Sequence, residues 1–100
     1  MEKKKKIFVS IPYTGHEREF PARCIRAHER HDEKGDVLTP IDIVEDDATP
    51  YNACMGRTIT ELLSCDLVIF ADGWYESKGC QLEHRAAEIY GIEMLTDAKI

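Results

Sequence analysis

The chain has 100 residues, of which 43% are hydrophobic and 32% charged, and its formal net charge at pH 7 is -6. This length and composition suit a single small domain over residues 1–100 with a modest core. The negative charge argues against binding to polymeric nucleic acid, because that binding depends on Lys and Arg neutralising phosphates. No stretch approaches the ~18 apolar residues of a membrane span, and the basic residues 3–6 run into a predicted strand instead of a signal peptide. We therefore expect a cytoplasmic protein with no membrane partner.

The first half of the chain predicts a strand, a helix and a second strand. The first strand covers residues 7–11 and ends at Pro12 and the turn that follows. A helix is expected over residues 20–31, and residues 37–38 form a short strand that Pro40 stops. Residues 42–47 are an acidic loop without the glycine or the spacing of a calcium site, so we expect solvated carboxylates there.

The second half predicts two helices and two strands. Thr49 as N-cap and Pro50 at the first helical position begin a helix that runs to Ser64. Its apolar positions are Met55, Ile59, Leu62 and Leu63. The unbroken apolar run at residues 67–71 is typical of a strand that a parallel sheet covers on both faces.

The last helix and strand complete the predicted fold. The helix is expected to end at Gly91 and to bury Leu82, Ala86, Ile89 and Tyr90. A final strand covers residues 92–95. The alternating order of strands and helices predicts an α/β sandwich with right-handed crossovers.

Polar residues follow the central strand at residues 67–71. Asp72, Gly73 and Trp74 end it, and Ser77 opens the next helix. Open parallel sheets bind ligands at the carboxyl ends of their strands. Glu83 falls about two turns into the helix, where its side chain leans back toward the helix start. The sequence therefore predicts a small-molecule site at this end of the sheet.

The cysteines and histidines have an ordinary interpretation and a metal-binding alternative. No CxxC pair occurs among Cys24, Cys54, Cys65 and Cys80, which we expect to be reduced thiols. Cys24, His28 and His31 share one predicted helix face and would ligate zinc if a fourth ligand such as His16 approached. A half-buried amphipathic face explains the same spacing, and we expect neither a metal nor a cofactor.

Taken in order, the motifs resemble the nucleoside 2-deoxyribosyltransferase-like superfamily, above all its short bacterial and phage members. They are Ser10-Ile11-Pro12-Tyr13-Thr14-Gly15, Cys65-Asp66, Gly73-Trp74, Ser77, Gly79 and Glu83, and they span nearly the whole chain. The resemblance implies a flavodoxin-like three-layer sandwich with a parallel sheet of about four strands, assembled as a homodimer or larger. Enzymes of this superfamily cleave the N-glycosidic bond of deoxynucleosides or deoxynucleotides.

The resemblance also implies roles for individual residues. Glu83 matches the nucleophile that captures C1′ of the sugar; the alternative is a helix carboxylate near the positive end of the helix dipole. Ser77 matches a serine that holds the 5′-phosphate in the monophosphate glycosidases, where the transferases have Asp; the alternative is an ordinary N-cap. Lys78, Arg57 or Arg23 would add positive charge.

The resemblance also implies a set of substrate-binding residues, and two positions of the chain differ from the superfamily motifs. The expected substrate-binding residues are Ser10, Pro12, Tyr13, Gly15, Gly73, Trp74, Ser77 and Gly79. Tyr13 and Trp74 either stack on a base or roof the crevice. Thr58 stands where active relatives carry Asp, and Ile11 replaces a glycine. We expect Thr58→Asp to be tolerated, because position 58 lies away from the apolar positions of its helix, and to raise activity.

Two aspartates remain as candidates around this site. Asp72 is the substitute acid for the leaving base, and Asp66 is expected to make a turn hydrogen bond. The expected activity is N-glycosidic cleavage of (deoxy)nucleoside 5′-monophosphates. The alternatives are base exchange on free nucleosides and a catalytically idle nucleotide-binding module, which Thr58 favours.

Overall fold

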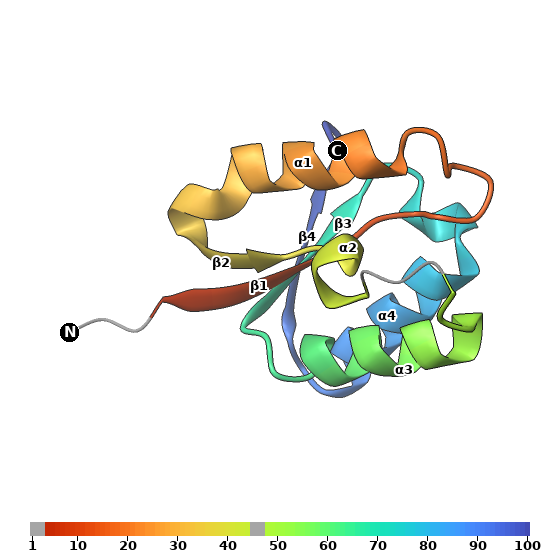
Figure 1. Ribbon diagram of the computed structural model, residues 1–100. Helices are drawn as coiled ribbons and strands as arrows, with labels where there is room; N and C mark the ends of the chain where they lie inside the picture. The colour runs from red at the N-terminus through yellow and green to blue at the C-terminus, as the bar shows by residue number, and fades with distance from the viewer. Residues whose placement is uncertain (1–3, 45–47) are drawn as a thin grey trace.

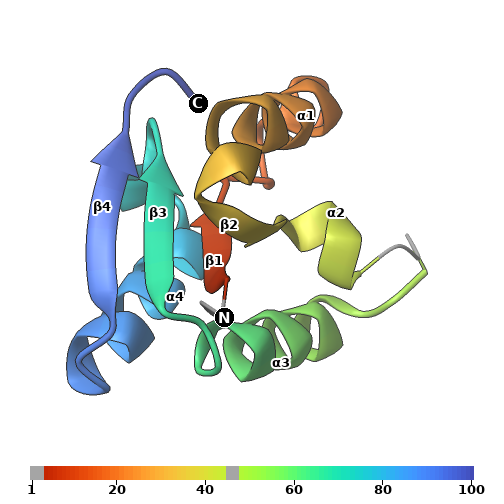
Figure 2. The same cartoon turned by 90° about the vertical axis from the view of Figure 1, so that its left-hand side faces the viewer.

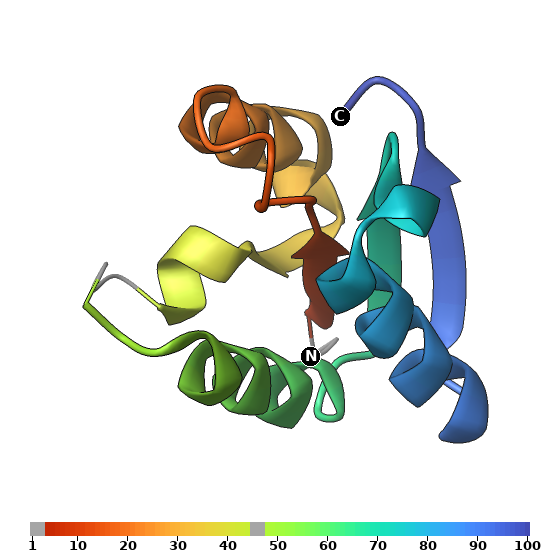
Figure 3. The same cartoon turned by 90° about the vertical axis from the view of Figure 1, so that its right-hand side faces the viewer.

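The computed structural model describes residues 4–44 and 48–100, and its centre is a four-stranded parallel sheet (Figure 1). The strands lie in the order β2-β1-β3-β4. They are β1 (Lys5–Ser10), β2 (Gly35–Leu38), β3 (Leu67–Ala71) and β4 (Glu93–Asp97). Figures 2 and 3 show β4 at one edge of the sheet and α2 beyond β2 at the other.

Helices cover both faces of the sheet, so the predicted flavodoxin-like three-layer sandwich is confirmed. They are α1 (Phe20–His31), α2 (Pro40–Ile43), α3 (Tyr51–Leu62) and α4 (Lys78–Ile89), with 3-10 turns η1 (Asp32–Lys34) and η2 (Trp74–Glu76). Figure 1 shows α1 above the sheet and α3 and α4 below it.

The two cores follow from the alternation of side chains along the strands. Ile7 of β1 and Ile69 of β3 belong to the cluster that α1 covers. Their neighbours Phe8 and Val68 belong to the cluster with Leu62 of α3 on the opposite face. Successive strand residues point to opposite faces, so a central strand buried on both sides must be apolar throughout, as β3 is.

Two predictions about residues 40–50 were wrong. Residues 40–43 form a helical turn, because the Asp42 carboxylate accepts the Thr39 backbone N–H at 2.8 Å in a capping box. Asp42 is therefore a structural residue and not a solvated loop carboxylate; residues 45–47 lie outside the described residues. The N-cap of α3 is Pro50, one residue later than the predicted Thr49.

The predicted buried face of α4 was also wrong, except at Ala86, which is partly buried against the core. Leu82, Ile89 and Tyr90 are 51%, 62% and 68% exposed, whereas the helix buries Cys80, Glu83 and Ala87. The helix is rotated so that Glu83 faces the interior, where the Ser10 hydroxyl binds it. Its predicted end is confirmed: Gly91 has φ +68° and the Ile92 N–H donates to the Ala87 carbonyl at 2.9 Å.

The other sequence expectations concern membranes, thiols and metals. Among the described residues, no helix has both the length and the apolar character needed to cross a bilayer. All four cysteines are free thiols, as predicted. Within residues 4–44 and 48–100, no three His, Cys, Asp or Glu side chains are placed to hold a metal ion. His28 instead bonds Asp32 and Asp42, and His31 bonds Asp97, so the zinc alternative has no support.

Candidate functional site

A cavity of about 860 Å³ lies beside the carboxyl ends of β1 and β2 and the start of α4, within the size range of small-molecule sites. Four parts of the chain line it: the segment from Ile11 to Pro21, the α2 region, one face of α3, and residues 76–83. Figure 3 shows the segment after β1 and the turn before α4 near the carboxyl end of β1. The cavity lies at the predicted edge of the sheet, but the residues directly after β3 are not among those that line it, so the small-molecule site stays a prediction.

Glu83 is a buried carboxylic acid at the cavity wall, only 5% exposed. The hydroxyl of Ser10, the last residue of β1, donates to its Oε1 at 2.6 Å. Burial raises the pKa of Glu83 from 4.5 to about 7, although hydrogen bonds from Ser10 and Thr58 favour the carboxylate and limit the rise. An acid with this pKa reaches both protonation states near neutral pH, which suits a catalytic group.

The first turn of α4 opens on the same cavity. The Ser77 side chain accepts the Cys80 backbone N–H at 3.3 Å, so Ser77 is the N-cap of the helix. The first-turn N–H groups of Lys78 and Gly79 have no partner within a helix, and both residues line the cavity. This end of the cavity carries the positive end of a 12-residue helix.

Gly79 permits the close approach of α3 to this helix start. A Cβ at Gly79 would lie 3.3 Å from the Met55 Sδ and 3.3 Å from the Tyr51 hydroxyl. Such a contact is tighter than most real Cβ contacts. The glycine therefore keeps the first turn of α4 close to the α3 wall of the cavity.

The structure brings together only part of the predicted site. Tyr13, Ser77, Gly79 and Glu83 line the cavity. Ser10 lies behind Glu83 and Pro12 is buried. Gly15 and Gly73 adopt positive φ values of 85° and 80°, the first in the turn after β1 and the second at the start of η2. These two glycines shape the loops that flank the cavity.

Asp72 and Trp74 are not among the described residues that line the cavity. The Asp72 side chain is exposed, and its backbone carbonyl accepts Arg23 Nη2 at 2.6 Å. The Trp74 ring stacks on the His84 ring with centroids 4.4 Å apart and an interplanar angle of 7°. The roles predicted for Asp72 and Trp74 thus gain no geometric support and stay predictions.

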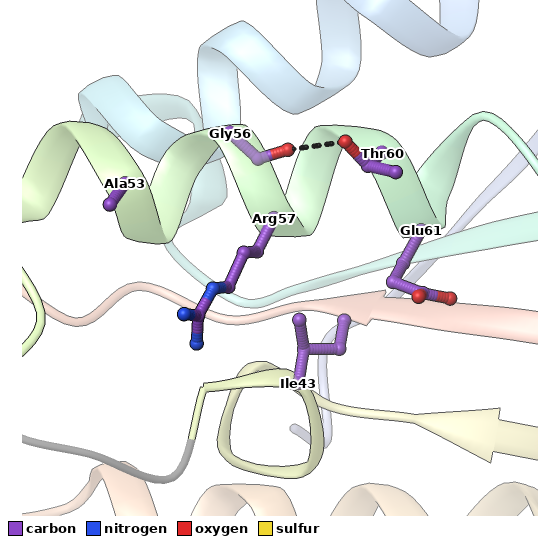
Figure 4. A pocket seen from close by; sticks show the side chains of 6 residues that line it. All are labelled: Ile43, Ala53, Gly56, Arg57, Thr60 and Glu61. Atoms are coloured by element: carbon purple, nitrogen blue, oxygen red, sulfur yellow. Dashed lines mark hydrogen bonds between the residues drawn. The ribbon is translucent and has the colours of Figure 1, made fainter.

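Of the three cations predicted to add charge at the site, Lys78 alone lines the cavity. Arg23 donates to the backbone carbonyls of Ile100 and Asp72. Arg57 lies on another side of α3, in a second hollow of about 420 Å³ toward Ile43 of α2 (Figure 4). Asp66 was predicted to make a turn hydrogen bond, but its Oδ2 instead accepts the backbone N–H of Lys6, 60 residues away, at 2.8 Å.

Sequence reasoning missed the α3 wall of the cavity. Tyr51, Met55 and Thr58 recur at helical spacing and line the cavity with Cys54. Thr58 is buried, so the expectation that position 58 lies away from the buried side of α3 was wrong. The spacing of these residues was a usable signal, and Leu62 extends the same face by one turn, but Ile59 and Leu63 indicated another face.

Comparison with known proteins assigns a family. Residues 5–96 match the family described as a domain of unknown function (DUF4406), and the chain belongs to this family. No curated protein matches the chain. The description of the family names no reaction, so any function must be argued from the site.

Proposed function

We propose that this DUF4406 chain cleaves the N-glycosidic bond of (deoxy)nucleoside 5′-monophosphates, with Glu83 as the nucleophile. The observation that carries the proposal is a buried carboxylate at a cavity of nucleotide-compatible size, beside the start of α4. The resemblance to nucleoside 2-deoxyribosyltransferase-like proteins supports it, because Glu83 occupies the position of their nucleophile.

The reaction has two steps that use the same carboxylate. In the first, a Glu83 oxygen bonds to C1′ while the C1′–N bond breaks and its electron pair leaves with the base, which takes up a proton. In the second, a water oxygen bonds to C1′ while the bond between C1′ and the Glu83 oxygen breaks, which restores the carboxylate. One water proton stays on the new sugar hydroxyl, and the other is released and balances the proton that the base took up. Glu83 must be ionised to attack, and at a pKa of about 7 about half of it is ionised at neutral pH. The Ser10 hydrogen bond fixes Oε1 for this attack.

The start of α4 is the proposed phosphate site. The N–H groups of the first turn and the Lys78 ammonium favour an anion. Glu17 and Glu76 also line the cavity and disfavour one. The preference for a 5′-phosphate therefore measures whether the helix start outweighs these two carboxylates.

The first prediction is that base release requires Glu83. Wild type is incubated with a panel of nucleosides and their monophosphates, and free base is followed by chromatography. We expect Glu83→Gln to abolish release with an unchanged circular dichroism spectrum, and Glu29→Gln, an exposed change on α1, to retain it. A charge-assisted phosphate contact should favour monophosphates about tenfold or more in affinity by calorimetry.

Other outcomes select the alternatives. Wild-type release by Glu83→Gln would reject the mechanism. Release that occurs only when a second base is added would indicate base exchange. Tight binding without release would indicate the idle nucleotide-binding module.

We further propose that the protein assembles as a homodimer, as the resemblance implies. The outer face of α4 exposes Leu82, Ile89 and Tyr90. Arg85 and Glu88 form an exposed ion pair on the same helix. Two copies of this face packed antiparallel would cover the apolar side chains and place opposite charges across the two-fold axis.

A further inference from the structure

Three buried polar side chains from three different elements converge at the floor of the cavity. They are Ser10 of β1, Thr58 of α3 and Glu83 of α4. The Ser10 hydroxyl donates to Glu83 Oε1 at 2.6 Å. The Thr58 hydroxyl donates to the Met55 carbonyl oxygen at 3.1 Å. Thr58 lines the same cavity as Glu83, and its hydroxyl favours the ionised form of that carboxyl group. The single Thr58 proton therefore has two acceptors to serve, the Met55 carbonyl and the Glu83 carboxylate.

The Thr58 hydroxyl can hydrogen-bond Glu83 in both protonation states of the carboxyl group. A hydroxyl donates once and accepts through its lone pairs, whereas a carboxyl group donates only when it is protonated. With Glu83 protonated, Thr58 can donate to Met55 and accept the carboxyl proton. With Glu83 ionised, Thr58 can turn its proton to the carboxylate. The Met55 carbonyl is not orphaned by that turn, because it lies within α3 and can accept the N–H of residue 59.

We propose that Thr58 is a positioning residue for Glu83. When Glu83 loses its proton, the Thr58 hydroxyl stops donating to the Met55 carbonyl and donates to the Glu83 carboxylate. The catalytic meaning of this inference rests on the proposed function, whereas the exchange itself does not. Thr58 then holds the ionised nucleophile together with Ser10 and is not the remnant of a lost acid.

The other ionisable groups at the cavity approach from three sides. They are Tyr13 and Glu17 from the segment after β1, Tyr51 and Cys54 from α3, and Glu76, Lys78 and Cys80 from η2 and α4. Besides burial, the two hydroxyls of Ser10 and Thr58 are the groups that shift the pKa of Glu83. Removal of the Thr58 hydroxyl should therefore change that pKa directly.

The inference reverses the sequence-based expectation for Thr58→Asp. A second carboxylate beside a buried one disfavours ionisation of both. We expect Thr58→Asp to raise the pKa of Glu83 above its wild-type value and to lower any base release at neutral pH.

Carboxyl ¹³C NMR of glutamate-labelled protein tests the inference, with the Glu83 resonance assigned by its loss in Glu83→Gln. We expect Thr58→Val to raise the pKa of Glu83 by about one unit, because a lost bond to a charged group disfavours the carboxylate. Thr58→Ser should restore the wild-type value. Thr58→Ala replaces Thr58→Val if the valine variant does not fold.

Thr60→Val is the matched control. The Thr60 hydroxyl also donates to a carbonyl of its own helix, that of Gly56 at 2.7 Å, but it faces the second hollow (Figure 4). Its removal should leave the pKa of Glu83 unchanged.

Two results would overturn the inference: a wild-type Glu83 pKa in Thr58→Val, or an equal shift in Thr60→Val. The titration needs no substrate, so its failure is distinguishable from failure of the proposed function. Base release that depends on Glu83 without the Thr58 shift would reject the inference alone. The shift without base release would reject the proposed function alone.

Discussion

Glu83 is the residue at which stability and function conflict. A carboxylate buried to this degree is costly unless it is hydrogen-bonded, and Ser10 and Thr58 compensate only part of that cost, because the pKa still rises to about 7. An isosteric amide would keep a hydrogen bond to Ser10 without a charge. The site thus keeps an ionisable group where a neutral one would be more stable, as functional sites often do.

The second prediction is that Glu83→Gln stabilises the protein at alkaline pH. The folded-state pKa of Glu83 is raised, so its favourable contribution is complete below about 4.5 and is lost as pH rises through about 7. We expect Glu83→Gln to gain roughly 1–3 kcal/mol of unfolding free energy relative to wild type between pH 5 and pH 8. Urea unfolding at both pH values measures this. Glu29→Gln, an exposed change on α1, should show no such gain, and an equal gain there would contradict the assignment to Glu83.

Among the elements, the short α2 is held by polar contacts as well as by Ile41 and Ile43, which pack against the two cores. It has four residues, and it contributes Pro40 and Ile41 to the cavity wall. His28 of α1 connects it to the rest of the fold, with Nε2 2.7 Å from Asp42 Oδ2 and Nδ1 2.9 Å from Asp32 Oδ1. Burial alone lowers the pKa of His28, but the hydrogen bonds to Asp32 and Asp42 outweigh it and raise the pKa.

The third prediction concerns this histidine. A raised folded-state pKa means that its stabilisation is complete below the unfolded value near 6.5 and is lost as pH rises through the folded value. We expect His28→Gln to destabilise the protein more at pH 6 than at pH 8 in urea unfolding. Hydrogen exchange in residues 39–44 should accelerate in the same variant. The exposed His16→Gln is the control, and a loss independent of pH would contradict the ion-pair role.

The elements also show how far the sequence predicts this structure. The residues of β3, Ser77 as N-cap and Gly91 as the end of α4 follow from local patterns, and the structure confirms them. The rotation of α4 does not, because it depends on a hydrogen bond between Glu83 and Ser10, which are 73 residues apart. A rule based on apolar spacing buries Leu82 instead.

Only part of the candidate site was predictable from the sequence, as was the case for the helices and strands. Glu83 and Ser77 were predicted from motifs in one stretch of sequence, and both line the cavity. The role of Thr58 was missed because it depends on the packing of α3 against α4. Arg57 was predicted as a candidate because its charge is visible in the sequence. The side of α3 on which it lies depends on packing and is not visible there.

For the whole molecule, the outer face of α4 and the edge strand β4 leave apolar side chains exposed. The described part of the chain leaves Leu82, Ile89 and Tyr90 of α4 exposed, and Leu95 of the edge strand β4 is also 49% exposed. The edge strand β4 and the exposed apolar face of α4 are both features that favour association with another chain. We propose a second copy of this chain as the partner. In a two-fold arrangement, Arg85 of one copy would meet Glu88 of the other.

The fourth prediction is that Ile89→Glu disrupts this dimer. We expect light scattering coupled to size-exclusion chromatography to give twice the chain mass of 11.4 kDa for wild type and the single chain mass for Ile89→Glu. The matched control is Ile25→Glu on α1, because Ile25 is 60% exposed and Ile89 is 62% exposed, yet α1 covers the other face of the sheet. A buried charge at a two-fold interface is repeated on both subunits, so one substitution introduces two unpaired carboxylates. A monomeric wild type, or dissociation by Ile25→Glu and not by Ile89→Glu, would rule out the α4 face as the interface.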